Sequence, residues 1–231
     1  MKYVVFILFL GLNIMNAKII AHIPEASGIC YLKDSKTLVV VNDEGTIYEL
    51  TRKGKILRKH FLGDYDLEGV TTYKGNLLLA VEDLHAVFVV DARSFKILKK
   101  VKIKKHKNIE KSKKHGIEGI SVFEGDIYLS HQASGLFKIN GIHKKKAKVT
   151  KVYKDKYSDL SGLSFHDGYL YMLSDKKNLL IKYDVKNKRT IKTIKLKKAA
   201  QEGICFDEKN NIYIADDNGR ILKYKMKDLG L

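Results

Sequence analysis

The stretch Asp66-Leu67-Glu68-Gly69-Val70 returns in varied form along the chain, which has five versions of this short motif. In most versions a glutamate or serine stands directly before a glycine, and isoleucine, valine or leucine follows it. The five glycines are separated by 41, 50, 43 and 41 residues, which is the period of the four-stranded blades of β-propellers. The motifs are Glu25–Ile29, Asp66–Val70, Gly116–Ile120, Asp159–Leu163 and Gln201–Ile204.

The residues between the glycines predict four short strands per repeat. Polar turns such as Asp43-Glu44-Gly45 separate runs rich in valine, isoleucine, leucine and tyrosine, and no stretch has the periodicity of an amphipathic helix. An insertion at about residues 104–115 explains the longer second spacing. The strands expected in the first repeat are Gly28–Leu32, Thr37–Asn42, Thr46–Leu50 and Ile56–Phe61.

The last repeat is short, because only 28 residues follow Gly203 and they suffice for three strands. A spare strand, Lys18–Ile23, precedes the first motif. An open sheet edge invites aggregation, so we expect this strand to complete the last blade. The prediction is an all-β, five-bladed β-propeller that forms one domain over residues 18–231 and is a monomer. The competing layout is an open or six-bladed ring, for which no sixth motif is present.

The N-terminus has the features of a secretory signal. Lys2 is followed by a mostly apolar stretch, Tyr3–Ile14, and Ala17 is a small residue suited to cleavage. Such a short apolar run is more typical of a signal peptide than of a membrane span. We therefore expect residues 1–17 to direct export to the periplasm or cell envelope. The alternative is an uncleaved anchor that holds residues 3–14 in the inner membrane, the one route to membrane association expected here.

The net charge is +18, which raises the question of an anionic partner. The lysines are spread over predicted strand edges and loops, with denser stretches at 99–114 and 144–156. Aromatic residues for base stacking are not interleaved with them, and export would separate the protein from nucleic acid. We expect no nucleic-acid partner and interpret the lysines as a solvated surface that discourages edge-to-edge pairing.

The acidic residues, in contrast, gather at one predicted face. In a propeller the motif lies where each innermost strand begins beside the central channel, and the second strand of each blade ends on the same face. Fourteen of the 26 acidic residues fall at or next to these positions: Glu25, Asp43, Glu44, Asp64, Asp66, Glu68, Glu82, Asp83, Glu118, Asp159, Asp175, Glu202, Asp216 and Asp217. Carboxylates brought so close must take up protons or hold a cation, and calcium accepts six to eight oxygen ligands in flexible geometry. The alternative is that the acids cap turns and pair with lysines. The predicted metal ligands, one per blade, are Glu25, Glu68, Glu118, Asp159 and Glu202.

Two cysteines, Cys30 and Cys205, occupy equivalent positions two residues after a motif glycine, on blades expected to be neighbours. They could form a disulfide or pack as two small thiols, and both possibilities remain open.

The five motifs, in their order, resemble those of the SdiA-regulated family of bacterial envelope proteins, which is distantly similar to NHL-repeat propellers. The resemblance covers residues 25–225 and is most specific in DLSGLSF (159–165), YMLSD (171–175) and AQEGICFDEKNNIYIADDNG (200–219). It implies a five-bladed propeller with bound calcium and no settled biochemical activity. It also implies that the same five acids correspond to the family's acidic positions. Some members begin with a membrane anchor.

Three functions are compatible with the sequence. The first is an exported calcium-binding propeller whose mouth holds an unknown ligand or protein. The second is a calcium-dependent hydrolase of the lactonase, phosphodiesterase or phytase-like kind acting at the channel mouth, with His115 or His131 as candidate base. The third is an interaction scaffold whose acids serve only turns and ion pairs. No GxSxG motif is present.

Overall fold

The computed structural model describes residues 17–109, 116–153, 157 and 159–231. Within these ranges it contains twenty β-strands and one short 3-10 helix, η1 (Met226–Leu229), so the all-β prediction is confirmed. The predicted signal segment lies outside the described residues except for Ala17. Among the helices of the described ranges, none has the length and apolar character that crossing a membrane requires.

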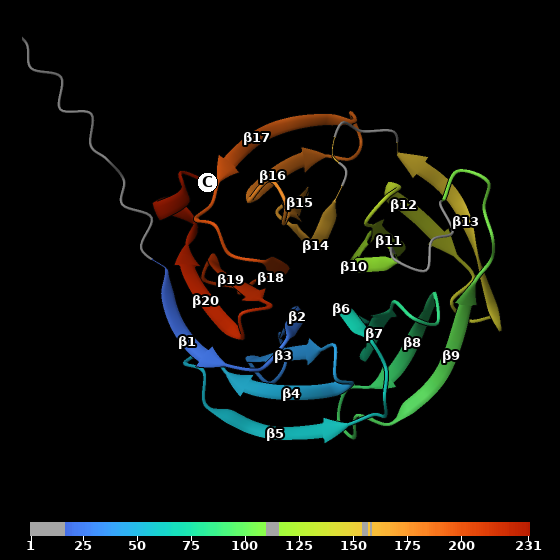
Figure 1. The fold of residues 1–231 in the computed structure, drawn as a ribbon, viewed down its shortest axis with the longest axis horizontal. Helices are drawn as coiled ribbons and strands as arrows, with labels where there is room; N and C mark the ends of the chain where they lie inside the picture. The colour runs from blue at the N-terminus through green and yellow to red at the C-terminus, as the bar shows by residue number, and fades with distance from the viewer. Residues whose placement is uncertain (1–16, 110–115, 154–156, 158) are drawn as a thin grey trace, which may run out of the picture.

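The strands form four sheets arranged in a ring, antiparallel except for one pairing, with β2, β6, β10, β14 and β18 innermost (Figure 1). Each of these five strands packs against the innermost strand of the following repeat, and β18 packs against β2. The five strands therefore surround a common axis. The first of two simple four-stranded sheets contains β2 (Ala26–Leu32), β3 (Thr37–Asn42), β4 (Thr46–Thr51) and β5 (Ile56–Phe61). The second contains β14 (Leu160–His166), β15 (Tyr169–Ser174), β16 (Leu179–Asp184) and β17 (Arg189–Lys195).

The last sheet is completed by the N-terminal strand, as predicted. It contains β18 (Gln201–Phe206), β19 (Asn211–Asp216), β20 (Arg220–Lys225) and β1 (Lys18–His22), and β1 pairs antiparallel with β20. The two ends of the chain are therefore joined in one sheet, and β1 covers the edge that β20 would otherwise leave open.

The remaining eight strands form one sheet, where separate four-stranded blades were predicted. Its two halves are joined because the outer strands β9 and β13 pair in parallel, Lys102 opposite Lys146 and Ile103 opposite Ala147. The amide of Lys104 extends this contact by donating to the carbonyl of Ala147 over 2.9 Å. The motif spacing gives no sign of this junction, because it pairs the outer strands of two different repeats. One half contains β6 (Leu67–Tyr73), β7 (Asn76–Val81), β8 (Ala86–Asp91) and β9 (Ile97–Ile103). The other half contains β10 (Ile117–Phe123), β11 (Asp126–His131), β12 (Gly135–Asn140) and β13 (Lys146–Tyr153).

The core lies between neighbouring sheets. Every residue of β3 is buried, because both faces of this strand pack against another sheet. Val39 and Val41 belong to a cluster with residues of β6, β7 and β8, whereas Leu38 and Val40 pack with residues of β19 and β20. The alternation of side chains along a strand thus fills the spaces on both sides of a sheet.

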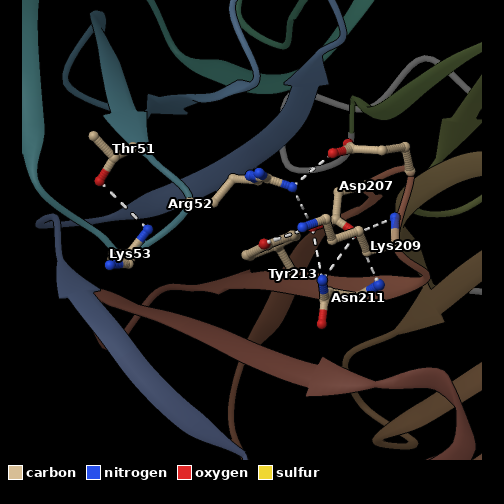
Figure 2. A network of polar contacts seen from close by, with 8 residues as sticks. Thr51, Arg52, Lys53, Asp207, Lys209, Asn211 and Tyr213 are labelled. Carbon is tan, nitrogen blue, oxygen red and sulfur yellow. Dashed lines mark hydrogen bonds and ion pairs between the residues drawn. The ribbon is translucent and has the colours of Figure 1, made fainter.

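An ionic network centred on the buried Asp207 connects the first sheet to the last (Figure 2). The Arg52 guanidinium, in the turn after β4, lies 2.7 Å from the carboxylate of Glu208 and 3.5 Å from that of Asp207. Asp207 also accepts hydrogen bonds from Asn211 and from the Tyr213 hydroxyl. Burial favours the neutral form of Asp207, but these hydrogen bonds outweigh it and keep the pKa of the carboxyl below its ordinary value.

Candidate metal centre at the channel mouth

The repeated motif forms a β-bulge at the start of each innermost strand. In the first, second and last motifs, the residue before the glycine has no partner in the adjacent strand. In the third and fourth motifs, neither that residue nor the glycine has such a partner. A bulge inserts an unpaired residue and redirects the side chains around it. The residues freed from the ladder include Glu68, Glu118 and Glu202, which explains why the acids stand at this point of the motif.

The motif glycines are required because the inner strands approach one another closely here. A Cβ atom at Gly69 would lie 2.6 Å from the carbonyl oxygen of Glu118, and one at Gly203 would lie 2.5 Å from that of Ser27. These neighbours are backbone atoms that cannot move aside cheaply. Each motif therefore contacts the next around the axis, and the acids beside the glycines are brought to one shared opening, which we call the channel mouth.

The five predicted ligands do not contribute equally. Glu118 is buried, Glu68 and Glu202 are partly buried, and Glu25 is exposed. Electrostatic interactions link Glu68 to Glu118 and link Glu118 to Glu202. Glu25 instead acts on Asp43 and Asp217. The structure thus gathers three of the predicted acids and leaves Glu25 at the edge of the group.

Asp159 binds the turn that follows β15. Its carboxylate accepts a hydrogen bond of 2.7 Å from the backbone amide of Lys176 and forms a 3.1 Å ion pair with the ammonium group of the same residue. This is the turn-and-lysine role that the sequence left open as the alternative to metal binding. Asp159 still adds its charge to the surroundings of Glu118 and Glu202.

Three carboxylates in the described residues, those of Asp43, Asp66 and Glu68, each have an oxygen atom within 4.8 Å of the other two. Asp43 follows β3 and accepts a hydrogen bond from the hydroxyl of Ser27, while Asp66 lies just before β6. Two oxygens bound to one calcium ion at 2.3–2.6 Å can be at most about 5 Å apart, so the spacing fits a shared cation. Asp43 and Asp66 were assigned to this face from the sequence but not to the ligand set. Their positions, after a second strand and before a motif, are the signal that could have singled them out.

The carboxyl groups of the mouth hold protons more tightly than isolated carboxyls do. Burial, reinforced by the charges of Glu82 and Asp66, raises the pKa of Glu118 to about 8. Burial and the charge of Asp217 raise the pKa of Glu202 to about 10. The pKa of Glu68 is raised well above its usual range by burial and by Glu118. A cation would offset the repulsion that adds to these shifts.

Two further acids of the mouth have a pKa near neutrality. Burial raises the pKa of Glu82 to about 7, assisted by its interaction with Asp66. Burial and the charge of Asp43 raise the pKa of Asp217 to about 7. The sequence had placed both residues on this face without assigning them a role.

Of the two histidines that the sequence suggested as a general base, the structure describes one, His131. His115 lies outside the described residues. His131 is fully buried at the end of β11, where its Nδ1 accepts a hydrogen bond from the amide of Ala133 and its ring packs edge to face with His85. The first of these contacts ties His131 to the local turn.

Both cysteines are free thiols and buried. Burial raises the pKa of Cys30 to about 12, so its reactive thiolate form is disfavoured. Of the two possibilities that the sequence left open, the structure has the packed thiols.

The fold and the site together define the class: a β-propeller with an acidic opening on its axis. Its structure is similar to Myxococcus xanthus glutaminyl cyclase, with a TM-score of 0.66, 12% identity, and 90% of this chain and 95% of the other covered. It is also similar to the Cps50 (Swd1) β-propeller domain of Myceliophteria thermophila (TM-score 0.55, 11% identity, 91% and 99% covered). A third similar structure is virginiamycin B lyase from Staphylococcus aureus (TM-score 0.51, 15% identity, 87% and 70% covered).

At these identities the similar structures establish the fold alone. The sequence itself matches the SdiA-regulated family over residues 11–220, and the chain belongs to that family. Comparison with curated protein sequences finds no match.

Proposed function

We propose that this protein is an exported, five-bladed calcium-binding β-propeller of the periplasm or cell envelope, whose channel mouth holds a ligand or protein partner. The observation that carries the proposal is the group Asp43, Asp66 and Glu68, with three carboxylate oxygens within 4.8 Å. The raised pKa of Glu68 supports it, because protons and a cation compete for the same site. Five innermost strands around one axis support the count of five blades.

In this proposal the ion is held by Asp43, Asp66 and Glu68, and Glu118 and Glu202 add to the negative field around it once they are ionised. Glu25 and Asp159 contribute charge at the edge of the mouth. The calcium ion would join the end of β3 to the start of β6 and neutralise this part of the mouth, so that a partner meets an ordered surface.

Calcium titration of the chelator-treated protein by calorimetry tests the proposal. We expect saturable binding that Glu68→Gln or Asp66→Asn weakens at least about tenfold, since each removes a charged ligand. Glu124→Gln is the matched control, because Glu124 is an exposed acid that forms an ion pair with Lys186 outside the mouth. Absence of binding heat, or equal loss in the control, would sink the proposal in favour of a scaffold whose acids serve only turns and ion pairs.

A calcium-dependent hydrolase remains the second candidate. The observation that favours it is the pKa of about 7 for Glu82 and Asp217, which suits a general base at neutral pH. Lactones, phosphodiesters and phosphomonoesters should be screened with calcium and with chelator. Turnover that needs calcium and is lost in Glu82→Gln or Asp217→Asn would support hydrolysis, whereas turnover that survives metal removal would contradict it.

Export can be tested separately. Mass spectrometry of the protein recovered from the cell envelope should find a chain that begins at Lys18 if the signal is cleaved. A chain that retains residues 1–17 and fractionates with the inner membrane would establish the anchored alternative.

A further inference from the structure

A hollow of about 500 Å³ opens where β1, β20 and the turn between β4 and β5 meet. The acids of the channel mouth do not line it. Figure 2 shows two of its residues, Arg52 and Lys53, on the turn that reaches toward the last sheet. The charged residues lining the hollow comprise five cations and one carboxylate: Lys18, Arg52, Lys53, Lys223, Lys225 and Asp228.

The strand register forces two of these cations together. Lys18 on β1 stands directly opposite Lys223 on β20, and like charges in directly opposed positions destabilise a sheet. Lys225 lies two residues further along β20, on the same face as Lys223. Three ammonium groups therefore share one side of a two-strand ladder, and the β4–β5 turn adds two more cations to the same hollow.

Little in the surrounding protein neutralises these charges. Arg52 is engaged with Glu208 and Asp207. Among the described residues, Lys18, Lys53, Lys223 and Lys225 take part in no ion pair. The ammonium group of Lys223 lies 5.1 Å from the centre of the Tyr213 ring. Burial lowers the pKa of Lys223; Asp207 opposes this shift, and the charges of Arg52 and Lys18 add to it.

Lysines stand directly opposite each other elsewhere in the fold, and these pairs can be compared with Lys18 and Lys223. Lys138 stands opposite Lys151, but Asp126 neutralises Lys138 at 2.8 Å. Lys182 stands opposite Lys192, and Lys192 donates a hydrogen bond to the carbonyl of Gly230. The pair on β1 and β20 differs because further cations converge on it around a hollow.

We propose that this hollow binds a phosphate-type oxyanion, carried either by a soluble phosphorylated molecule or by the headgroup of an anionic lipid. Such an anion accepts several N–H donors at once and offsets the mutual repulsion of the lysines. The volume exceeds that of a bare phosphate, so it admits the attached molecule. A lipid headgroup is the second source if residues 1–17 stay attached, because Lys18 then follows the apolar stretch that ends at Ile14 by four residues. The proposal does not depend on calcium at the channel mouth.

Titration of the ¹⁵N-labelled full-length chain with inorganic phosphate tests the site. We expect saturable shifts in the amides of β1 and β20, and at least about tenfold weaker binding in the double variant Lys18→Gln/Lys223→Gln. The matched control is Lys182→Gln/Lys192→Gln, which removes the same charge from an equivalent pair of opposed strands and should keep the affinity within about twofold. Absence of saturable shifts, or equal weakening in the control, overturns the proposal.

Thermal unfolding gives a second, independent readout. Without phosphate, Lys18→Gln/Lys223→Gln should unfold at a higher temperature than the unaltered protein, because a repulsive pair is gone. Added phosphate should then raise the midpoint of the unaltered protein and leave that of the variant unchanged. A phosphate-induced rise that persists in the variant contradicts the assignment.

Vesicles distinguish the two sources of the anion. If the headgroup of a lipid is the ligand, the chain should prefer phosphatidylglycerol to phosphatidylcholine vesicles, and the double variant should lose that preference. If phosphate shifts are seen while the vesicle preference is the same in both proteins, the ligand is a soluble phosphorylated molecule. Salt should weaken either interaction, as expected for exposed charges.

Discussion

Gly69 illustrates how one missing side chain allows the ring to close. A Cβ here would lie 2.6 Å from the Glu118 carbonyl oxygen and 3.0 Å from the amide nitrogen of Ile120. Both are backbone atoms of the neighbouring motif, so the strain can be relieved only by moving a strand. The acid and the glycine of the motif are thus coupled: the close approach that the glycine permits also brings the carboxylates together.

We expect Gly69→Ala to reduce the free energy of unfolding by about 3 kcal/mol, at the upper end of overpacking effects. Gly75→Ala is the matched control, because Gly75 has a φ of +78° and nothing within 4 Å of a Cβ. It should lose only about 1 kcal/mol from backbone strain. Chemical denaturation of both variants measures the difference, and equal losses would argue against close packing of the motifs.

Asp207 is a second residue whose environment decides its role. It is buried and bonded to Asn211, Tyr213 and Arg52, so Asp207→Ala should cost about 3 kcal/mol by leaving these donors unsatisfied. Asp91→Ala removes a partly exposed carboxylate at the end of β8 that bonds to Ser94, and it should cost clearly less. A small loss in Asp207→Ala, measured by urea denaturation, would contradict a fastening role for the network.

At the scale of the element, β1 is the piece that joins the two ends of the chain. It pairs with β20 along one edge, and Ile20 packs against the core between the first and last sheets. Because Gly54 in the β4–β5 turn lies against the carbonyl of Ile20, β1 also supports the first sheet. Its loss would therefore affect both sheets at the junction.

A chain that begins at Ile23 should be less stable than one that begins at Lys18, with a midpoint lower by roughly 5–10 °C, and should self-associate through the exposed edge of β20. Thermal unfolding and size-exclusion chromatography measure the two effects. Equal midpoints and a monomeric short chain would mean that the ring closes without β1.

The whole molecule combines a strong positive charge with one concentrated acidic opening, and its stability should depend on pH through that opening. In the calcium-free protein the pKa values of Glu118 and Glu202 are about 8 and about 10, above those of the unfolded chain. Between about pH 4.5 and these values the folded protein binds more protons than the unfolded one, so its stability falls as pH rises.

We therefore expect the midpoint of the chelator-treated protein to fall by on the order of 5 °C between pH 6 and pH 9. Glu202→Gln should make the midpoint less dependent on pH, because it removes the carboxyl with the higher of these two pKa values. Excess calcium should reverse the trend, because it binds the ionised carboxylates and stabilises the fold more as pH rises. A midpoint that does not change with pH in the chelator-treated protein would contradict the proton-holding mouth.

Much of the architecture is determined by the sequence alone, because local rules act at every motif. The alternation of strands and polar turns predicts all-β structure, and the spacing of Gly28, Gly69, Gly119, Gly162 and Gly203 predicts the repeat. The shortage of a strand after Gly203 also predicts the pairing of the N-terminal strand with the last sheet, since an open edge is costly. The strands and turns follow from residues close together in the chain, whereas the repeat and the closure of the last sheet follow from the motif spacing and from the number of strands.

The ligand geometry, the parallel junction of β9 with β13 and the cationic hollow are decided only by the tertiary structure. Each depends on residues from different repeats whose separation is set by bulges, register and sheet packing. The sequence could assign Asp43, Asp66 and Glu68 to one face, but it could not bring their oxygens within 4.8 Å of one another. Nor could it place Lys18 opposite Lys223, because a shift of one residue in register would turn one of these side chains to the other face.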